Sequence, residues 1–251
     1  METLHEGFSG RPKRRFFPGP DQADASSESP ACPNVLVYVL GPSRDESVIR
    51  DMDPPAGQSY LQLYDGNEGG SSVPDPFRED WWMDGDPLGV GPLLNPHDRD
   101  AISHLGSDLD FNLAMTLDKA VNGTSLMLML QVGDQWLLFP GDAQWGTWKA
   151  AMDNPQWNKL LEKTTFYKIG HHGSHNATPV EFVEKTVGQD FCAMASTHAV
   201  KQWPSIPKEE LLSALGSKTK KIARSDRESD APAGVFHVVS AHYIETEIPL
   251  L

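Results

Sequence analysis

Two almost continuously apolar runs, separated by only two residues, constrain the fold of this chain more than any other feature of its sequence. The runs are "SLMLMLQV" at 125–132 and "QWLLFP" at 135–140, with Gly133 and Asp134 between them. A two-residue loop with glycine is typical of a β-hairpin, because glycine adopts the positive φ that such turns require. Strands with so few polar residues are expected to be covered on both faces. The sequence therefore predicts a buried hairpin.

Strand-like and helix-like segments alternate on both sides of this hairpin. Short apolar runs bounded by turn residues predict further strands at 35–40, 59–65, 164–170, 191–197, 220–226 and 234–244. Apolar residues at helical spacing predict helices around 145–152, 160–161, 179–187 and 207–216. Ser43 followed by Glu46 has the pattern of a capping box and predicts one more short helix. An antiparallel hairpin among alternating strands and helices indicates layered α/β packing.

Composition divides the chain into an N-terminal segment and one domain. Residues 1–33 are dominated by Gly, Pro, Ser and charged residues, which cannot offset the entropy of ordering, so we expect this segment to be disordered. Residues 34–251 are expected to form a single αβ domain, because a chain of 251 residues can bury one substantial core. Inside that domain, residues 66–100 form a long Gly/Pro/Asp-rich loop in our interpretation.

Charge and cysteine content narrow the classes of function. The chain has 21 basic and 35 acidic residues, a net charge of −14, so it has no broad basic surface for strong nucleic-acid binding. Cys32 and Cys192 are the only cysteines, too few for a disulfide framework, which fits a reducing compartment. No apolar stretch has the length of a signal peptide or a membrane span. We therefore expect a cytoplasmic protein that does not bind membranes.

Polar groups that could perform chemistry follow two of the predicted strands. Asp142 comes directly after the second hairpin strand, and His171 and His172 come directly after the strand at 164–170. Sites in layered α/β folds are usually built at strand ends, and zinc prefers imidazole nitrogen and carboxylate oxygen as ligands. The spacing is compatible with a metal site. It is also compatible with a glycine-rich turn whose histidines cap strand ends and bond to neighbouring carbonyls.

The sequence resembles a known family over residues 115 to 215. The stretches "NGTSLMLMLQVGDQWLLFPGDAQWGTWKAAM" and "FYKIGHHGSHNATP" are similar to the second half of a metallo-β-lactamase-fold hydrolase, in the branch that includes the nuclease-like domain of the competence protein ComEC. Four features occur in the family's order: an Asn-x-x-Ser before a strand, a strand ending in Gly-Asp, a strand ending in His-His-Gly-Ser, and a later strand near "AMAST". The resemblance implies an α+β fold of αββα layers, with a mixed β-sheet and flanking helices.

The resemblance also implies an activity and a set of site residues. In that family the Gly-Asp carboxylate bridges two metal ions, a role that falls on Asp142, and the histidine after the next strand completes the site, a role that falls on His171 or His172. Asn122 and Ser125 match the Asn-x-x-Ser element and would position groups near the site, or simply cap the start of the strand. The implied function is zinc-dependent hydrolysis of a phosphodiester or a related ester, with one or two zinc ions in the complete fold.

One departure from the family limits this expectation. Hydrolases of this fold carry a His-x-His-x-Asp-His loop in their first half, and this sequence has no such string. The nearest approach is "PHDRDAISH", where His97, Asp98, Asp100 and His104 offer suitable atoms in a different order. The chain therefore resembles a C-terminal half, which would hold at most one zinc ion and could be inactive alone. Two alternatives remain: a non-catalytic half-domain that pairs with a partner chain, or a soluble αβ domain with no metal.

Three further residues are weaker candidates. Ser174 lacks the surroundings of a hydrolase nucleophile and is interpreted as a turn residue near the site. His175 could orient a metal ligand or could simply face solvent. Arg224 ends a predicted strand and could reach the site as an anion-binding group, although a surface ion pair is the simpler interpretation.

Overall fold

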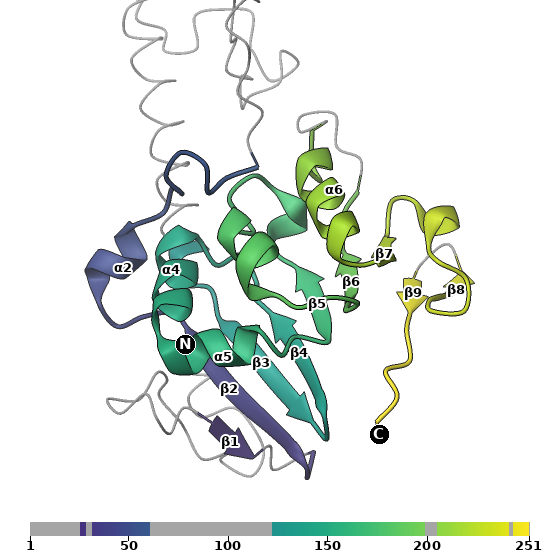
Figure 1. Ribbon diagram of the computed structural model, residues 1–251, viewed down its shortest axis with the longest axis horizontal. Coiled ribbons are helices and arrows are strands. Elements are labelled where there is room, and N and C mark those ends of the chain that lie inside the picture. Colours follow the sequence, from purple (N-terminus) through teal and green to yellow (C-terminus); the bar gives the residue numbers. More distant parts are fainter. Residues whose placement is uncertain (1–25, 29–31, 61–121, 199–204, 241–242, 251) are drawn as a thin grey trace, which may run out of the picture.

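A seven-stranded sheet forms the centre of the computed structural model, which describes residues 26–28, 32–60, 122–198, 205–240 and 243–250 (Figure 1). The strand order follows the chain, β1-β2-β3-β4-β5-β6-β7. The strands are β1 (Ser26–Glu28), β2 (Val35–Gly41), β3 (Met127–Val132), β4 (Gln135–Phe139), β5 (Phe166–Ile169), β6 (Cys192–Ala195) and β7 (Lys221–Arg224). The predicted loop at 66–100 and the candidates at 97–104 lie outside the described residues.

The pairing changes from antiparallel to parallel in the middle of the sheet. Strands β1 to β4 pair antiparallel, and β4 to β7 pair parallel. The last residues of β4, β5, β6 and β7 therefore lie along one edge, which we call the carboxyl edge. The predicted hairpin is confirmed as β3 and β4, joined through Gly133 at φ 60°. Because β3 runs opposite to β4, the beginning of β3 also lies at the carboxyl edge.

Helices pack on one face of this sheet (Figure 1). They are α4 (Trp145–Asp153), α5 (Pro155–Leu161) and α6 (Glu209–Lys218), with the π-helix η5 (Phe182–Thr186) where a helix was predicted at 179–187. Asn154 begins α5, since its side chain accepts hydrogen bonds from the backbone N–H of Gln156 and Trp157. Short 3₁₀ turns occur at η4 (His171–Gly173) and η6 (Glu228–Asp230).

The predicted helix near Ser43 forms, but with a different cap. It is α2 (Glu46–Arg50), and its N-cap is Asp45, whose side chain accepts a hydrogen bond from the backbone N–H of Ser47 at 2.9 Å. Ser43 lies two residues earlier and accepts from the backbone N–H of Asp45. A carboxylate directly before the helix satisfies one of its unpaired N–H groups, so the capping box centred on Ser43 was wrong.

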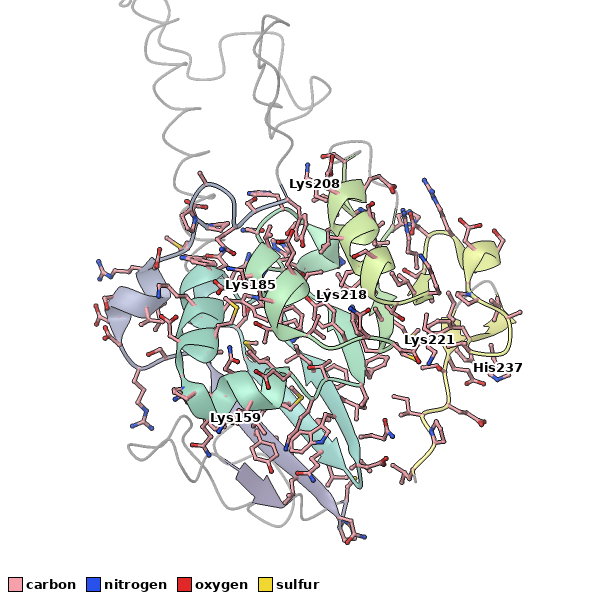
Figure 2. The ribbon with its side chains drawn as sticks, in the orientation of Figure 1. Lys159, Lys185, Lys208, Lys218, Lys221 and His237 are labelled. Atoms are coloured by element: carbon pink, nitrogen blue, oxygen red, sulfur yellow. The ribbon has the colours of Figure 1, made fainter. Side chains whose placement is uncertain are left out.

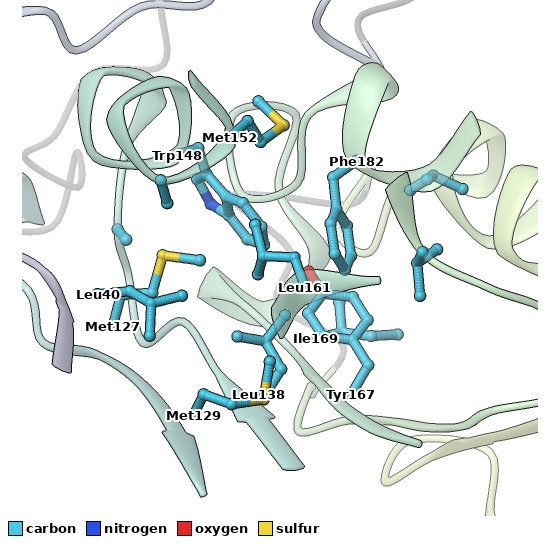
Figure 3. Packing of buried hydrophobic residues seen from close by; sticks show 14 of the residues in the cluster. Leu40, Met127, Met129, Leu138, Trp148, Met152, Leu161, Tyr167, Ile169 and Phe182 are labelled. Atoms are coloured by element: carbon cyan, nitrogen blue, oxygen red, sulfur yellow. The ribbon is translucent and has the colours of Figure 1, made fainter. Parts of the chain in front are cut away.

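The core lies between the sheet and its helices (Figure 3). Met129, Leu138 and Tyr167 project from neighbouring strands, and Trp148 and Phe182 meet them from α4 and η5. All five are fully buried, with exposed fractions of 0%. The rings of Trp148 and Phe182 pack in a tilted arrangement at 4.9 Å between centroids, and those of Tyr167 and Phe182 at 5.3 Å. Each such side chain stabilises the fold by about 1.5–3 kcal/mol through burial.

The opposite face of the sheet is also apolar but less well covered. Leu130 and Leu137 are cross-strand partners there, and both are half-buried, whereas Met129 and Leu138 on the helical face are fully buried. Phe139 and Phe166 pack together on this second face, at 5.8 Å between ring centroids. The expectation of cover on both faces therefore holds only partly within the described residues.

Three segments differ from the sequence-based expectations. Residues 1–33 were expected to be disordered, but Ser26–Glu28 form β1, because the edge of β2 offers backbone partners that no local pattern reveals. The predicted strand at 234–244 is divided into β8 (His237–Ser240) and β9 (Tyr243–Glu245), which form a separate two-stranded sheet. Residues 59–60 are not in a strand, and 61–65 lie outside the described residues.

Candidate functional site

Two glycines bring the ends of β4 and β5 into close contact at the carboxyl edge. The backbone N–H of His171 donates a hydrogen bond to the carbonyl oxygen of Gly141, at 3.2 Å. A Cβ on Gly170 would lie 2.9 Å from that same oxygen, so a side chain there would force the two strand ends apart. Gly141 itself has a φ of 58°. The backbone segments that carry Asp142 and His171, each adjacent to one of these glycines, therefore lie next to each other at the carboxyl edge.

The histidines occupy a left-handed turn that ordinary residues avoid. His171, His172 and Gly173 have φ angles of 38°, 56° and 78°. Positive φ at a residue other than glycine is uncommon and costs of order 1–3 kcal/mol, and such strain persists where the surrounding structure imposes it. Strain of this kind is often found at functional sites. Two successive strained histidines therefore mark this turn as a candidate site.

The surroundings hold the turn from several directions. Behind it, the phenol of Tyr167 and the hydroxyl of Thr178 share a buried hydrogen bond of 2.6 Å, and Trp148 Nε1 donates to the carbonyl oxygen of Ala177. Burial raises the pKa of Tyr167, so the phenol keeps its proton. On the side of α6, the backbone N–H of Lys208 donates to the carbonyl oxygen of Gly173. Backbone hydrogen bonds at both ends of the turn, from His171 N–H and to the Gly173 carbonyl, therefore hold it in place, and a fixed turn is preorganised for binding.

Hydrogen bonds assign the proton positions on both imidazoles. Ser174 Oγ donates its only proton to Asn176 Oδ1 at 2.8 Å, so towards His171 Nδ1, at 3.0 Å, it acts as an acceptor. His171 therefore carries its proton on Nδ1. His172 Nδ1 lies 2.6 Å from the carbonyl oxygen of Ser196, which can only accept, so it is also protonated. In the neutral form of each histidine, Nε2 is then the nitrogen that can bind a metal ion or take up a proton.

The two histidines nevertheless face different neighbours. His171 is half-buried and bonded to Ser174 within its own turn, while His172 is exposed and directed to Ser196, just after β6. Their ring centroids are 6.3 Å apart. The sequence left open which of the two would accompany Asp142. The backbone of His171 bonds to Gly141, next to Asp142, whereas the ring of His172 bonds to the Ser196 carbonyl after β6.

Asp142 has a lysine as its charged neighbour. It is half-buried, separated from the end of β4 by Pro140 and Gly141, and its negative charge acts on Lys168 of β5. Burial lowers the pKa of Lys168, and the Asp142 carboxylate opposes that shift. Lys168 Nζ donates to the carbonyl oxygen of Ile169 at 3.3 Å. Lys168 was missed in the sequence, although a charged residue inside an otherwise apolar strand was a usable signal.

The Asn-x-x-Ser element lies just before β3. Ser125 comes just before β3, and its Cβ is 3.7 Å from the position that a Cβ on Gly141 would take. Asn122 is 6% exposed, and its carbonyl oxygen accepts a hydrogen bond from the backbone N–H of Ser125. Ser125 therefore borders the stretch that carries Asp142, and Asn122 is joined to Ser125. Their contribution to chemistry stays a prediction.

The remaining candidates have structural partners. The carbonyl oxygen of His175 accepts a hydrogen bond from Ser59 Oγ at 3.0 Å, which fastens the segment before residue 61 to the histidine turn. Arg224 donates from Nε and Nη2 to both carboxylate oxygens of Asp226, at 3.0 and 2.8 Å, and it also contacts Glu209. Two carboxylates around one guanidinium leave Arg224 poorly suited to hold an anion.

The described residues alone do not make a complete metal centre. Across residues 26–28, 32–60, 122–198, 205–240 and 243–250, no three His, Cys, Asp or Glu side chains gather closely enough to hold an ion. His97, Asp98, Asp100 and His104 lie outside these ranges. In the same described part of the chain, no helix is both long and apolar enough to cross a membrane. Comparison with protein-family models, curated proteins and solved structures finds no match.

Proposed function

We propose that this chain carries part of the active site of a zinc-dependent hydrolase of the metallo-β-lactamase fold, acting on a phosphodiester or a related ester. The observation that supports the proposal most directly is the contact between the ends of β4 and β5. In this contact the His171 N–H donates to the carbonyl oxygen of Gly141, the residue directly before Asp142. The left-handed turn and its preorganised surroundings add to this support.

The donor atoms present fit zinc in kind but not in number. Asp142 offers carboxylate oxygens, and His171 offers Nε2 because its Nδ1–H donates a hydrogen bond to Ser174 Oγ. A catalytic zinc ion usually has about three protein ligands and one open position. Further ligands would have to come from residues outside the described ranges or from a partner chain. Alone, the pair is expected to hold at most one ion, and weakly.

The residues of this chain would contribute position and charge to the reaction. Zinc, when bound, supplies Lewis acidity and a hydroxide at neutral pH. His171 would be kept in one orientation by Ser174, and Asp142 would be kept beside it by the two glycines. The ammonium group of Lys168 lies close enough to Asp142 to act on its charge, and it would favour an anionic ester near the same edge.

Zinc content and phosphodiesterase turnover of the full chain test the proposal. We expect Asp142→Asn and His171→Ala each to reduce bound zinc and the turnover of a generic phosphodiester. His237→Ala is the matched control, because His237 is an exposed histidine on β8, outside the main sheet. Equal zinc content in all four proteins would contradict the metal site. Zinc retention with no turnover would contradict the hydrolase and leave a binding role.

Ser174 provides a second test through its bond to His171. Ser174→Ala removes the acceptor that holds the His171 proton on Nδ1, so zinc affinity should fall by roughly tenfold, as when outer partners of metal ligands are removed. The ring-nitrogen chemical shifts of His171 should also change, from values typical of one tautomer to values typical of a mixture of both. Ser213→Ala, at an exposed position of α6, should change neither quantity. An unchanged tautomer in Ser174→Ala would contradict this assignment.

A second candidate function is pairing with another chain as a non-catalytic half-domain. The observation that favours it is the second face of the sheet, where Leu130 and Leu137 are only half-buried among the described residues. An apolar sheet face normally packs on a further layer. Sedimentation equilibrium tests this alternative: self-association that Leu130→Gln weakens would support it, and a monomer at all concentrations would argue against pairing with itself.

A further inference from the structure

A pocket lined by three lysines lies near the beginning of β7, whereas the histidine turn lies at the carboxyl edge, where the parallel strands end. Its volume is about 380 Å³, within the range of small-molecule sites. The walls come from the end of α6, the start of β7, the loop before β6 and the segment after η6. The lysines are Lys218, Lys220 and Lys221, and among the described lining residues the only acidic one is Asp190. The lining therefore carries a net charge of about +2 on a chain of −14.

We propose that this pocket binds the phosphate groups of a phosphorylated ligand. Lys218 and Lys221 are close in sequence but belong to different elements, the last turn of α6 and the first residue of β7, and Figure 2 shows both at the lower end of α6. Lysines that line a concave site carry strongly hydrated ammonium groups, which are suited to bind phosphate as point charges. Pro232 and Val235 form an apolar wall beside them.

Existing hydrogen bonds position the lysines without using up their donors. Lys218 Nζ donates to the carbonyl oxygen of Glu184 at 3.0 Å, and Lys220 Nζ donates to that of Gly216 at 2.7 Å. An ammonium group has three N–H donors, so each of these bonds engages only one of them. Lys221 Nζ pairs with Asp190 at 3.0 Å. The Asp190 carboxylate therefore occupies the place at Lys221 that a phosphate oxygen would take.

Because Asp190 competes with phosphate for Lys221, substitutions of Asp190 and of Lys221 should change phosphate affinity in opposite directions. Asp190 is largely exposed and has a φ of 62°, a conformation that asparagine tolerates well, so Asp190→Asn should fold normally. Removing its charge frees Lys221, and the affinity for inorganic pyrophosphate should rise several-fold. Lys221→Gln should lower that affinity by roughly tenfold, the effect of losing one charge-assisted hydrogen bond. Lys159→Gln on α5, which Figure 2 shows apart from the pocket, should leave it unchanged.

Isothermal titration of the full chain with pyrophosphate at constant ionic strength measures these affinities. A parallel titration with adenosine diphosphate separates two sources of the phosphate groups. If the nucleotide binds more tightly than pyrophosphate, its nucleoside contacts the wall formed by Pro232 and Val235. If the two bind equally, the pocket recognises the phosphate groups alone. The proposal is overturned if pyrophosphate does not bind saturably, or if Lys159→Gln weakens binding as much as Lys221→Gln. In that case the lysines would only stabilise the carbonyl end of α6.

Discussion

At the scale of single residues, the histidine turn combines strain with support. His171 and His172 both adopt left-handed backbone angles, and Gly173 continues the same turn. The cost is met by packing around the turn: the carbonyl oxygen of Gly173 accepts from Lys208, and its Cα lies against Pro207, which precedes α6. A relaxed turn would point the imidazoles elsewhere. The conformation of the histidine turn therefore depends on a glycine that performs no chemistry.

This dependence predicts a large effect of Gly173→Ala. A Cβ at this position would lie 2.7 Å from Pro207 Cβ, in a backbone conformation with a φ of 78° that alanine disfavours. We expect the free energy of unfolding to fall by about 1–3 kcal/mol. Gly216→Ala in α6 is the matched control, because nothing lies within 4 Å of the added Cβ, and it should raise stability by up to about 1 kcal/mol. Urea unfolding measures both, and an unchanged Gly173→Ala would contradict the steric argument.

At the scale of elements, the parallel strands place polar groups at one sheet edge. Strands β4, β5, β6 and β7 end there, and each is followed by residues that interact with the neighbouring strand end. The backbone N–H of Thr197 donates to Ser225 Oγ, and Ser225 Oγ donates to the Thr197 carbonyl oxygen, which joins the segments after β6 and β7. Arg224, the last residue of β7, forms an ion pair with Asp226 in the segment that follows the strand.

The Arg224–Asp226 pair predicts a loss of stability at acidic pH. Hydrogen bonds from Arg224 hold the pKa of Asp226 below its ordinary value, so the unfolded chain binds this proton more readily than the folded one. The stabilisation is fully present above the unfolded pKa of about 3.9 and is lost as pH falls through the lower folded pKa. Asp226→Asn should therefore be less stable than the wild type at pH 6.

The difference in unfolding free energy between Asp226→Asn and the wild type should shrink as pH falls below 4, because the wild-type carboxyl then becomes neutral as well. Urea unfolding at pH 6, 4 and 3 measures this convergence. Asp153→Asn removes a carboxylate from an exposed pair with Lys149 on α4, so it should change stability by less than about 1 kcal/mol. A difference for Asp226→Asn that stays constant over the whole pH range would contradict the linkage.

At the scale of the whole molecule, the described fold has one core, and its main sheet has β1 and β7 as edge strands. The core fills the helical face of the sheet, where Met127, Met129 and Leu138 are fully buried. β1 covers the outer side of β2 through pairs between Ser26 and Tyr38, Ser27 and Val37, and Glu28 and Leu36. An uncovered edge strand offers unpaired N–H and carbonyl groups to other chains. β1 therefore protects β2 from edge-to-edge association.

Removing β1 should lower stability and promote association. A chain that starts at Asn34 lacks the three pairs with β2, and we expect its free energy of unfolding to fall by about 1–3 kcal/mol relative to a chain that starts at Ala25. Sedimentation velocity should also show larger species, because the side of β2 that β1 occupied becomes an exposed edge. Equal stability and equal sedimentation of the two chains would show that β1 has no such role.

The sequence by itself determined the features that depend on neighbouring residues. Alternation of apolar runs and turn residues indicated the strands and most helices, and Gly133 indicated the β3–β4 turn, because periodicity and φ preference are local properties. The same local reading placed Asp142 and His171 at strand ends. It could not order the strands in space, and their convergence at one edge depended on a resemblance that the comparisons with known proteins neither support nor contradict.

Only the tertiary structure decided which groups become partners. β1 is found on β2, β8 and β9 leave the main sheet, and Arg224 is neutralised by Asp226 and Glu209. His171 and His172 are adjacent in sequence, yet one bonds to Ser174 and the other to the Ser196 carbonyl. The lysine pocket likewise joins segments from Asp190 to Val235. Hydrogen bonds and ion pairs form between whichever groups long-range packing brings together, and no short stretch of sequence contains that information.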